Sequence, residues 1–219
     1  MRILVVSDLH GKIEIFQEII KQNGSAEVLV LPGDITHFGP KEALAAIARQ
    51  AQERGLPILA VAGNCDTAEV DAELARLGIG LDGTAKTIAD AAFHGVSATP
   101  PWQSRMYHRS EEEIAQALQA GFRQLGNPRW HVLVCHVPPR ETKVDKMYFG
   151  QHGGSMAIRQ FVDQHQPHLV LCGHIHEGRG VDQIGRTIVV NAGHGARGYY
   201  AVVDLGPEGP PSVILGRVV

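Results

Sequence analysis

Residues 168–176 have the sequence HLVLCGHIH, in which a short apolar run is followed by a glycine and by two histidines two positions apart. Short β-branched runs bounded by turn residues are typical of buried strands in a sheet covered on both faces. Four other apolar runs also end in a residue that can bind a metal ion: VVSDLH (5–10), VLVLPGD (28–34), ILAVAGN (58–64) and HVLVCH (131–136). Ligand sites in α/β sheets form beyond the carboxyl ends of strands. The repeated pattern therefore predicts one site built from five strand ends.

Strand-like and helix-like segments alternate along the 219 residues, which predicts an α/β fold with helices covering buried sheet. The expected strands are Ile3–Ser7, Val28–Leu31, Ile58–Ala62, Ala92–Ser97, His131–Cys135, Leu169–Cys172, Thr187–Asn191, Tyr200–Leu205 and Val213–Arg217. The expected helices are Lys12–Gln22, Pro40–Arg54, Thr67–Leu77, Glu111–Leu125 and Ser155–His165. After residue 185 no helical pattern remains, so the last three strands are expected to follow one another as antiparallel hairpins, which makes the sheets mixed.

Helix starts and irregular loops complete the predicted organisation. Asp66 with Glu69 and Ser110 with Glu113 have the spacing of capping boxes. The stretches 99–109 and 137–154 fit neither helix nor strand, and long irregular loops in a compact domain are often functional. No internal repeat or linker interrupts the chain, so one domain covering residues 1–219 is expected.

Composition excludes several classes of protein. The net charge is −3 and no basic run is present, which argues against a binder of long nucleic acid. No apolar run approaches the about 18 residues of a membrane span. Three cysteines, Cys65, Cys135 and Cys172, fit neither a disulfide framework nor a zinc clip, which favours a reducing, cytoplasmic setting. A homodimer is the commonest assembly for such a chain, and the sequence leaves the oligomeric state open.

The residues that follow the five strands form a plausible set of metal ligands. Residues two apart in an extended chain point the same way, so Asp8 with His10 and His174 with His176 can each face one centre. The complete set is Asp8, His10, Asp34, Asn64, His136, His174 and His176. Mixed oxygen and nitrogen donors suit divalent transition metals, with manganese preferred and iron, zinc, nickel or cobalt as alternatives. Seven ligands exceed what one ion needs, whereas two ions about 3.5–4 Å apart and sharing a carboxylate would use them all.

The segments DLHG, GDITHFG, GNCD, CHVPP and GHIH, in this order, resemble the calcineurin-like metallophosphoesterase superfamily, and in particular its compact prokaryotic phosphodiesterase branch. The resemblance covers nearly the whole chain and implies a mixed two-sheet β-sandwich flanked by helices, a four-layer αββα fold. It also implies three ligand roles: Asp8, His10 and His176 hold the first ion, Asn64, His136 and His174 hold the second, and Asp34 bridges them. A metal-bound hydroxide would then attack phosphorus in line.

The chain departs from the family pattern at three positions. Cys65 stands where many members have a histidine that protonates the leaving group, and burial usually makes a cysteine inert. His37 and Phe38 replace the aspartate and arginine of the phosphoprotein phosphatase branch, so a cationic clamp for phosphomonoesters is missing. The candidates for catalysis are therefore Asn64 and Asp34, with His37 or Cys65 as alternative acids. These departures favour phosphodiesters as substrates.

The irregular loops hold the candidates for substrate binding. Arg105, Tyr107 and Arg140, with Trp102 and His108, combine cationic and aromatic groups that can hold a phosphate and a base, although a packed surface loop is the alternative. His94, His194 and Arg197 also lie near strand ends, where ordinary loop chemistry is the simpler interpretation. Three rival functions remain at this stage: a phosphomonoesterase or nucleotide phosphatase, a nuclease, and a non-catalytic metal-binding scaffold.

Overall fold

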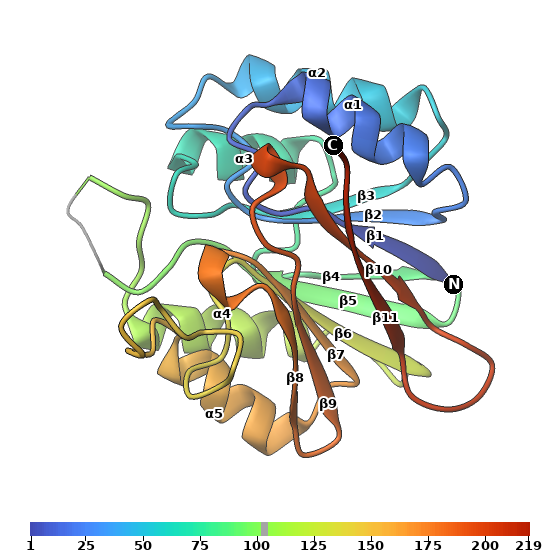
Figure 1. Cartoon of the computed structure of the whole chain (residues 1–219). Coiled ribbons are helices and arrows are strands. Elements are labelled where there is room, and N and C mark those ends of the chain that lie inside the picture. Colours follow the sequence, from blue (N-terminus) through green and yellow to red (C-terminus); the bar gives the residue numbers. More distant parts are fainter. Residues whose placement is uncertain (102–104) are drawn as a thin grey trace.

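The computed structural model of the chain describes residues 1–101 and 105–219 as two facing β-sheets with helices on their outer sides (Figure 1). In spatial order, the first sheet contains β11 (Ser212–Arg217), β10 (Tyr199–Asp204), β1 (Arg2–Val5), β2 (Val28–Pro32) and β3 (Ile58–Val61). The second contains β4 (Ala85–Ile88), β5 (Ala91–Val96), β6 (Trp130–Cys135), β7 (Leu169–Cys172), β9 (Thr187–Asn191) and β8 (Gly180–Ile184). The predicted two-sheet sandwich is confirmed.

The helices form the outer two of the four layers (Figure 1). The first sheet is covered by α1 (Ile13–Gln22), α2 (Lys41–Gln52) and α3 (Ala68–Arg76). The second is covered by α4 (Glu111–Phe122) and α5 (Met156–His165). Two short 3-10 helices, η1 (His176–Gly178) and η2 (Gly195–Arg197), follow β7 and β9. Among the described residues, none of the helices is long and apolar enough to cross a membrane.

The central strands are apolar on both faces because each face packs against a different layer. In β1, Ile3 and Val5 enter the core between the two sheets, whereas Leu4 packs under the helices of the first sheet. In β6, Val132 enters the central core and Leu133 packs against the helices of the second sheet. This double burial explains the continuous apolar runs of the sequence, since successive side chains of a strand point to opposite faces.

Parallel pairing brings the strand ends together. β1 pairs with β2 and β2 with β3 in parallel register, and β5, β6, β7 and β9 pair in parallel in the second sheet. The carboxyl ends of neighbouring parallel strands lie at the same edge of a sheet. The loops that carry the predicted ligands therefore meet at one edge of the sandwich.

The prediction that the last three strands follow one another as antiparallel hairpins is wrong for the first of them and right for the last two. β9 lies in the second sheet, where it pairs in parallel with β7 and antiparallel with β8. β10 belongs to the first sheet and pairs antiparallel with β1 and β11, so only β10 and β11 form the expected hairpin. β8 and β4 were missed because both are short edge strands with many polar residues.

Of the two predicted capping boxes, one is confirmed and one is wrong. Ser110 Oγ accepts from Glu113 N at 3.2 Å and Glu113 Oε2 accepts from Ser110 N at 2.8 Å, at the start of α4. α3 is instead capped by Thr67, whose Oγ1 accepts from Val70 N at 3.2 Å. Asp66 is buried and turned toward the loop after β2, as described below.

Two histidines are buried between the second sheet and its helices. The Nε2 atoms of His94 and His131 lie 2.9 Å apart, and both rings contact Phe122 and Phe161. His94 therefore does not line the predicted site. Burial lowers the pKa of His131 to about 4, with the charge of His168 acting in the same direction. Burial also lowers the pKa of His94, and the charge of His131 adds to that effect.

Because the folded protein prefers both rings neutral, their contribution to stability is present above the ordinary histidine pKa of about 6.5 and is lost as the pH falls toward 4. His131→Phe is expected to reduce this acid-induced loss of unfolding free energy by roughly 3 kcal/mol at most. Urea unfolding of metal-free protein between pH 7 and 4 measures the effect. His108→Gln, at an exposed histidine, serves as the control and should keep the wild-type pH dependence. An unchanged slope in His131→Phe would contradict this assignment.

Candidate metal centre

The seven predicted ligands lie together at the edge where the strands of both sheets end. Asp8 follows β1, Asp34 follows β2 and Asn64 follows β3. His136 follows β6, and His174 and His176 follow β7. Main-chain hydrogen bonds join these loops: Asp8 N donates to Gly33 O at 3.1 Å, His10 N to Asp34 O at 2.9 Å and Gly173 N to His136 O at 3.0 Å. Residues far apart in sequence are thus held in one cluster.

Backbone strain is concentrated in this cluster. Asp8, His10, Asp34 and His174 have φ angles of 56°, 45°, 50° and 65°. Residues other than glycine avoid this left-handed region, which costs roughly 1–2 kcal/mol per residue, and such residues gather at functional sites. The sharp turn at each strand end points the side chain across the edge of the sheet and toward its neighbours.

One group of contacts surrounds Asp8. Its Oδ1 lies 3.1 Å from His176 Nε2, and its Oδ2 accepts from His174 N at 3.0 Å. His10 lies beside this pair, with its ring centroid 6.2 Å from that of His176. Asp8, His10 and His176 are the residues expected to hold the first ion.

A second group surrounds His136, which is fully buried. His136 Nδ1 lies 2.8 Å from Pro32 O, which fixes the hydrogen on Nδ1 and leaves Nε2 facing the site. His136 Nε2 lies 2.9 Å from Asn64 Oδ1, and the ring centroids of His136 and His174 are 4.9 Å apart. These three residues are the ones expected to hold the second ion.

Asp34 lies between the two groups. Its Oδ1 is 3.4 Å from His136 Nε2, whereas its Oδ2 is 3.9 Å from His10 Nε2. Each oxygen therefore faces a different group. Cys65 N donates to Asp34 Oδ1 at 2.7 Å and holds the carboxylate in this orientation.

The site has the electrostatics of a cation site. Burial raises the pKa of Asp34 to about 7, an effect that His136 opposes and Asp8 reinforces. Burial also acts to raise the pKa of Asp8, but the hydrogen bond from His176 and the charge of His136 outweigh it and lower that pKa. For His136, burial is outweighed by the charges of Asp34 and Asp8, which raise its pKa. Two buried carboxylates thus favour positive charge at their centre.

The donor atoms fit a metal ion on geometric grounds as well. Asp34 Oδ1, Asn64 Oδ1 and His136 Nε2 converge, and with the hydrogen of His136 on Nδ1 all three are acceptors. His10 Nδ1 is buried and has no hydrogen-bond partner among the described residues. Single donor atoms of Asp8, Asp34 and His136 lie within 4.8 Å of one another. Converging acceptors of this kind are stabilised by a shared cation.

Asp66 supports the site from behind. Its buried carboxylate accepts hydrogen bonds from Thr36 N at 2.8 Å, Ile35 N at 3.2 Å and Gly63 N at 2.9 Å. It therefore ties the loop that carries Asp34 to the loop that carries Asn64. The sequence pattern predicted a helix cap at this position. A carboxylate just before a helix looks the same in the sequence whether it caps the helix or binds main-chain groups of other loops.

The two predicted alternative acids lie on one side of His10. One donor atom each from His10, His37 and Cys65 lies within 4.8 Å of the others, and the rings of His10 and His37 are 5.4 Å apart. His37 is exposed to solvent. Burial and the negative charge of Asp34 raise the pKa of the Cys65 thiol, which makes it a poor proton donor.

The predicted substrate-binding residues occupy three different environments. Tyr107 N donates to Asn64 O at 3.0 Å, and its hydroxyl donates to Asp71 Oδ2 at 2.8 Å, so this hydroxyl already has a partner within the protein. Arg140 and His174 both line a cavity of about 360 Å³. Arg105 is exposed. Trp102 lies outside the described residues.

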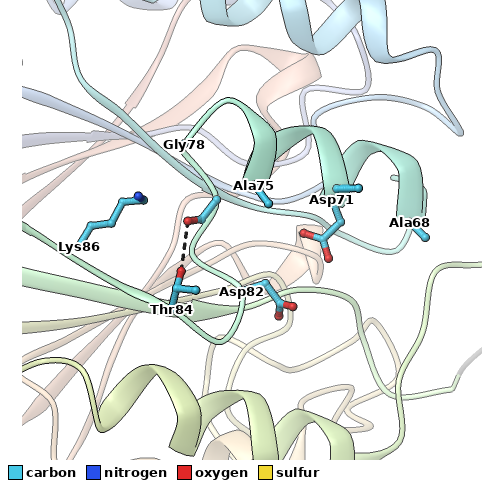
Figure 2. A pocket seen from close by; sticks show the side chains of 9 residues that line it. Ala68, Asp71, Ala75, Gly78, Asp82, Thr84 and Lys86 are labelled. Atoms are coloured by element: carbon cyan, nitrogen blue, oxygen red, sulfur yellow. Dashed lines mark hydrogen bonds between the residues drawn. The ribbon is translucent and has the colours of Figure 1, made fainter.

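Another cavity, of about 430 Å³, lies between α3 and the start of β4 (Figure 2). Asp71 and Asp82 line it, but both carboxylates have partners. Asp71 accepts hydrogen bonds from Ser97 Oγ and from the Tyr107 hydroxyl. Asp82 accepts from both terminal nitrogens of Arg109, at 2.7 and 2.8 Å. Thr84 Oγ1 donates to Gly80 O at 3.4 Å. These acidic groups are satisfied internally, so this cavity is a structural feature.

His194, for which the sequence favoured ordinary loop chemistry, lies beside the proposed ligands. Its ring stacks on that of His176 with a centroid distance of 4.0 Å, and donor atoms of His10, His176 and His194 lie within 4.8 Å of one another. Burial lowers the pKa of His194 to about 4, with the charge of His176 acting in the same direction. His194 follows a glycine after the end of β9, so the pattern of candidate ligands at strand ends includes this residue as well.

Known proteins place this chain in a family. A sequence profile described as calcineurin-like phosphoesterase matches residues 1–178. An uncharacterised protein of Methanocaldococcus jannaschii, MJ1162, is 36% identical over 198 residues, which cover 87% of each chain. Phosphodiesterase YfcE of Escherichia coli is 38% identical over 80 residues, which cover 32% of this chain and 42% of that protein.

Solved structures share the fold. The crystal structure of TT1561 of Thermus thermophilus has a TM-score of 0.75 at 20% identity and covers 99% of this chain and 98% of its own. An archaeal phosphodiesterase has a TM-score of 0.55 at 15% identity, with coverage of 98% and 99%.

The profile match over residues 1–178, on a mixed two-sheet sandwich, defines a phosphoester hydrolase of the metallophosphoesterase class. This chain belongs to the calcineurin-like phosphoesterase family, whose members use divalent metal ions.

Gly173 is required at the edge of the site because a Cβ atom there would overlap Ser7 Oγ and Asp8 Oδ2. Gly173→Ala is expected to lower the unfolding free energy by about 1–3 kcal/mol and to weaken metal binding, since Asp8 must move. Urea unfolding and the metal content of purified protein measure the two effects. The control is Gly24→Ala, where the nearest atom lies 4.0 Å from the new Cβ, with an expected change within about 0.5 kcal/mol. Equal behaviour of both variants would argue against close packing at Asp8.

Proposed function

We propose that this protein is a phosphodiesterase that works with two divalent transition-metal ions. The observation that carries the proposal is the position of Asp34, whose two oxygens face His10 on one side and His136 on the other. A carboxylate in this position can bridge two ions. The proposed ligands are Asp8, His10 and His176 for one ion, Asn64, His136 and His174 for the other, and Asp34 for both.

Bound ions would supply a water of lowered pKa and positive charge for the phosphoryl oxygens. The chain itself supplies orientation. The Nδ2 group of Asn64 lies 3.3 Å from Cys65 Sγ and 3.3 Å from Met106 Sδ, both of which are weak acceptors. We propose that this N–H group donates to a phosphoryl oxygen, while Asn64 Oδ1 stays directed at His136. The main-chain N–H of His174 keeps Asp8 in place during the reaction.

The preference for diesters rests on what surrounds the site. His37 and Phe38, in the loop after Asp34, supply no guanidinium group for a dianionic phosphomonoester. The names of two similar proteins agree with this preference, since YfcE and the archaeal structure are both called phosphodiesterases. For the proton of the leaving group we favour His37 over Cys65, because His37 is exposed at the rim whereas the thiol is buried. Arg140 and Arg105 remain proposed substrate contacts.

The mixed donor set, with two carboxylates and an amide among the imidazoles, favours manganese, and iron, zinc, nickel and cobalt are chemically compatible. We propose a small-molecule substrate and no long nucleic acid, because the net charge is −3. The three cysteines are free and buried, which agrees with a reducing, cytoplasmic setting. Both sheets contribute ligands, so residues 1–219 are proposed to act as one domain, with a homodimer as the expected assembly.

Asp34→Asn tests the proposal. Metal-stripped protein is supplied with manganese and bis(p-nitrophenyl) phosphate, and release of nitrophenolate is followed. Wild type should turn over only with the metal, and Asp34→Asn should lose at least about 100-fold in kcat/KM because an amide bridges two ions poorly. The control, Asp163→Asn, makes the same change at an exposed carboxylate on α5 and should keep full activity.

Three other outcomes separate the alternatives. Manganese-dependent turnover by Asp34→Asn at the wild-type rate would refute the bridging role. Cleavage of p-nitrophenyl phosphate but not of the diester would favour a phosphomonoesterase or nucleotide phosphatase. Bound metal without cleavage of either ester would favour a metal-binding scaffold.

A further inference from the structure

A basic cavity of about 550 Å³ lies beside the proposed metal ligands. Its lining consists of His10, Lys12, His37, His194, Ala196 and Arg197. No carboxylate is among these residues, although the chain as a whole carries a net charge of −3. The cavity is therefore a local region of positive charge at the edge of the site, and its volume is in the usual range for a small-molecule pocket.

The two permanent cations of this cavity are uncommitted. Within residues 1–101 and 105–219, neither the Lys12 ammonium nor the Arg197 guanidinium forms an ion pair or a side-chain hydrogen bond, and both side chains are exposed. Arg109 and Arg2, by contrast, are paired with Asp82 and Asp204, each at 2.8 Å or less. Cations without partners that face a pocket are available to an anionic ligand.

Main-chain hydrogen bonds place the backbone of Lys12 and Arg197 beside the loop that carries Asp8 and His10. Lys12 follows the loop that carries Asp8 and His10, and Lys12 N donates to Leu9 O at 2.9 Å. Arg197 lies in η2, where Ala196 N donates to Asp8 O at 2.9 Å and Gly195 N donates to Ser7 O at 2.8 Å. η2 also packs against α1, the helix that begins after Lys12. A ligand bound by these cations would therefore lie next to the proposed metal ligand His10.

We propose that this cavity binds a second anionic group of the substrate, a phosphate or a carboxylate carried by the ester arm that is not displaced. The inference rests on the proposed phosphodiesterase function and narrows its substrate to diesters with one acidic arm. Two cations on a compact rim suit one small anion. They do not suit a polyanion, which needs a row of cations along its length.

Three matched esters test this inference: ethyl, 2-carboxyethyl and 2-phosphonoethyl p-nitrophenyl phosphate. They share a leaving group and differ in the charge of the retained arm. Wild-type protein with manganese is expected to show a kcat/KM about tenfold higher for at least one acidic ester than for the ethyl ester, mainly through a lower KM. Whichever acidic ester is preferred identifies the anion as a phosphate or a carboxylate.

Lys12→Gln and Arg197→Gln should each reduce this preference severalfold. The control is Lys21→Gln, which removes the same charge from the far end of α1 and should keep the wild-type preference. Cleavage of the ethyl ester without any preference for acidic arms, or a preference that both cavity variants retain, would overturn the inference and leave the phosphodiesterase assignment intact. Failure to cleave any of the three esters would overturn both.

Discussion

Two carboxylates, Asp8 and Asp34, are buried where the two sheets meet, with side chains exposed by only a few per cent. Removing an ionised carboxylate from water costs several kcal/mol unless hydrogen bonds and opposite charge replace the solvent. The surrounding loops supply both. Main-chain N–H groups of Cys65 and His174 bind one carboxylate each, and His136 lies between them at the floor of the site. Burying both carboxylates in this way requires the left-handed φ angles of the turns at the strand ends.

Packing in the layers on either side offsets the free-energy cost of that strain. The central strands are apolar on both faces, and three separate clusters of buried side chains pack above, between and below the sheets. Burial of this extent stabilises by roughly 25 cal/mol per Å² of apolar surface, which is how a domain can hold several left-handed residues and two buried charges. Asp66 also holds two site loops together, since its carboxylate accepts hydrogen bonds from main-chain groups of both. The ligands are thus held in place before any ion binds.

Charge is distributed unevenly around the site. Negative groups lie at its floor, and the cations Lys12 and Arg197 lie on the rim of one adjoining cavity, with Arg140 on another. A negatively charged phosphoester is attracted to the rim, while the floor favours metal ions. Dissolved salt limits this attraction to distances of about 10 Å.

Local patterns in the sequence determined the helices, the seven candidate ligands and the strands other than β4 and β8. A short apolar run and a polar residue at its end are properties of a few consecutive residues, so VVSDLH or HVLVCH can be interpreted without knowledge of the rest. Only the tertiary structure decided which sheet each late strand joins, because β9 and β10 look alike in sequence and differ only in their distant partners. The same holds for Asp66, Tyr107 and His194, whose roles depend on contacts with residues tens of positions or more away, such as Thr36, Asp71 and His10. Such contacts follow from how layers pack against one another, which no local sequence pattern encodes.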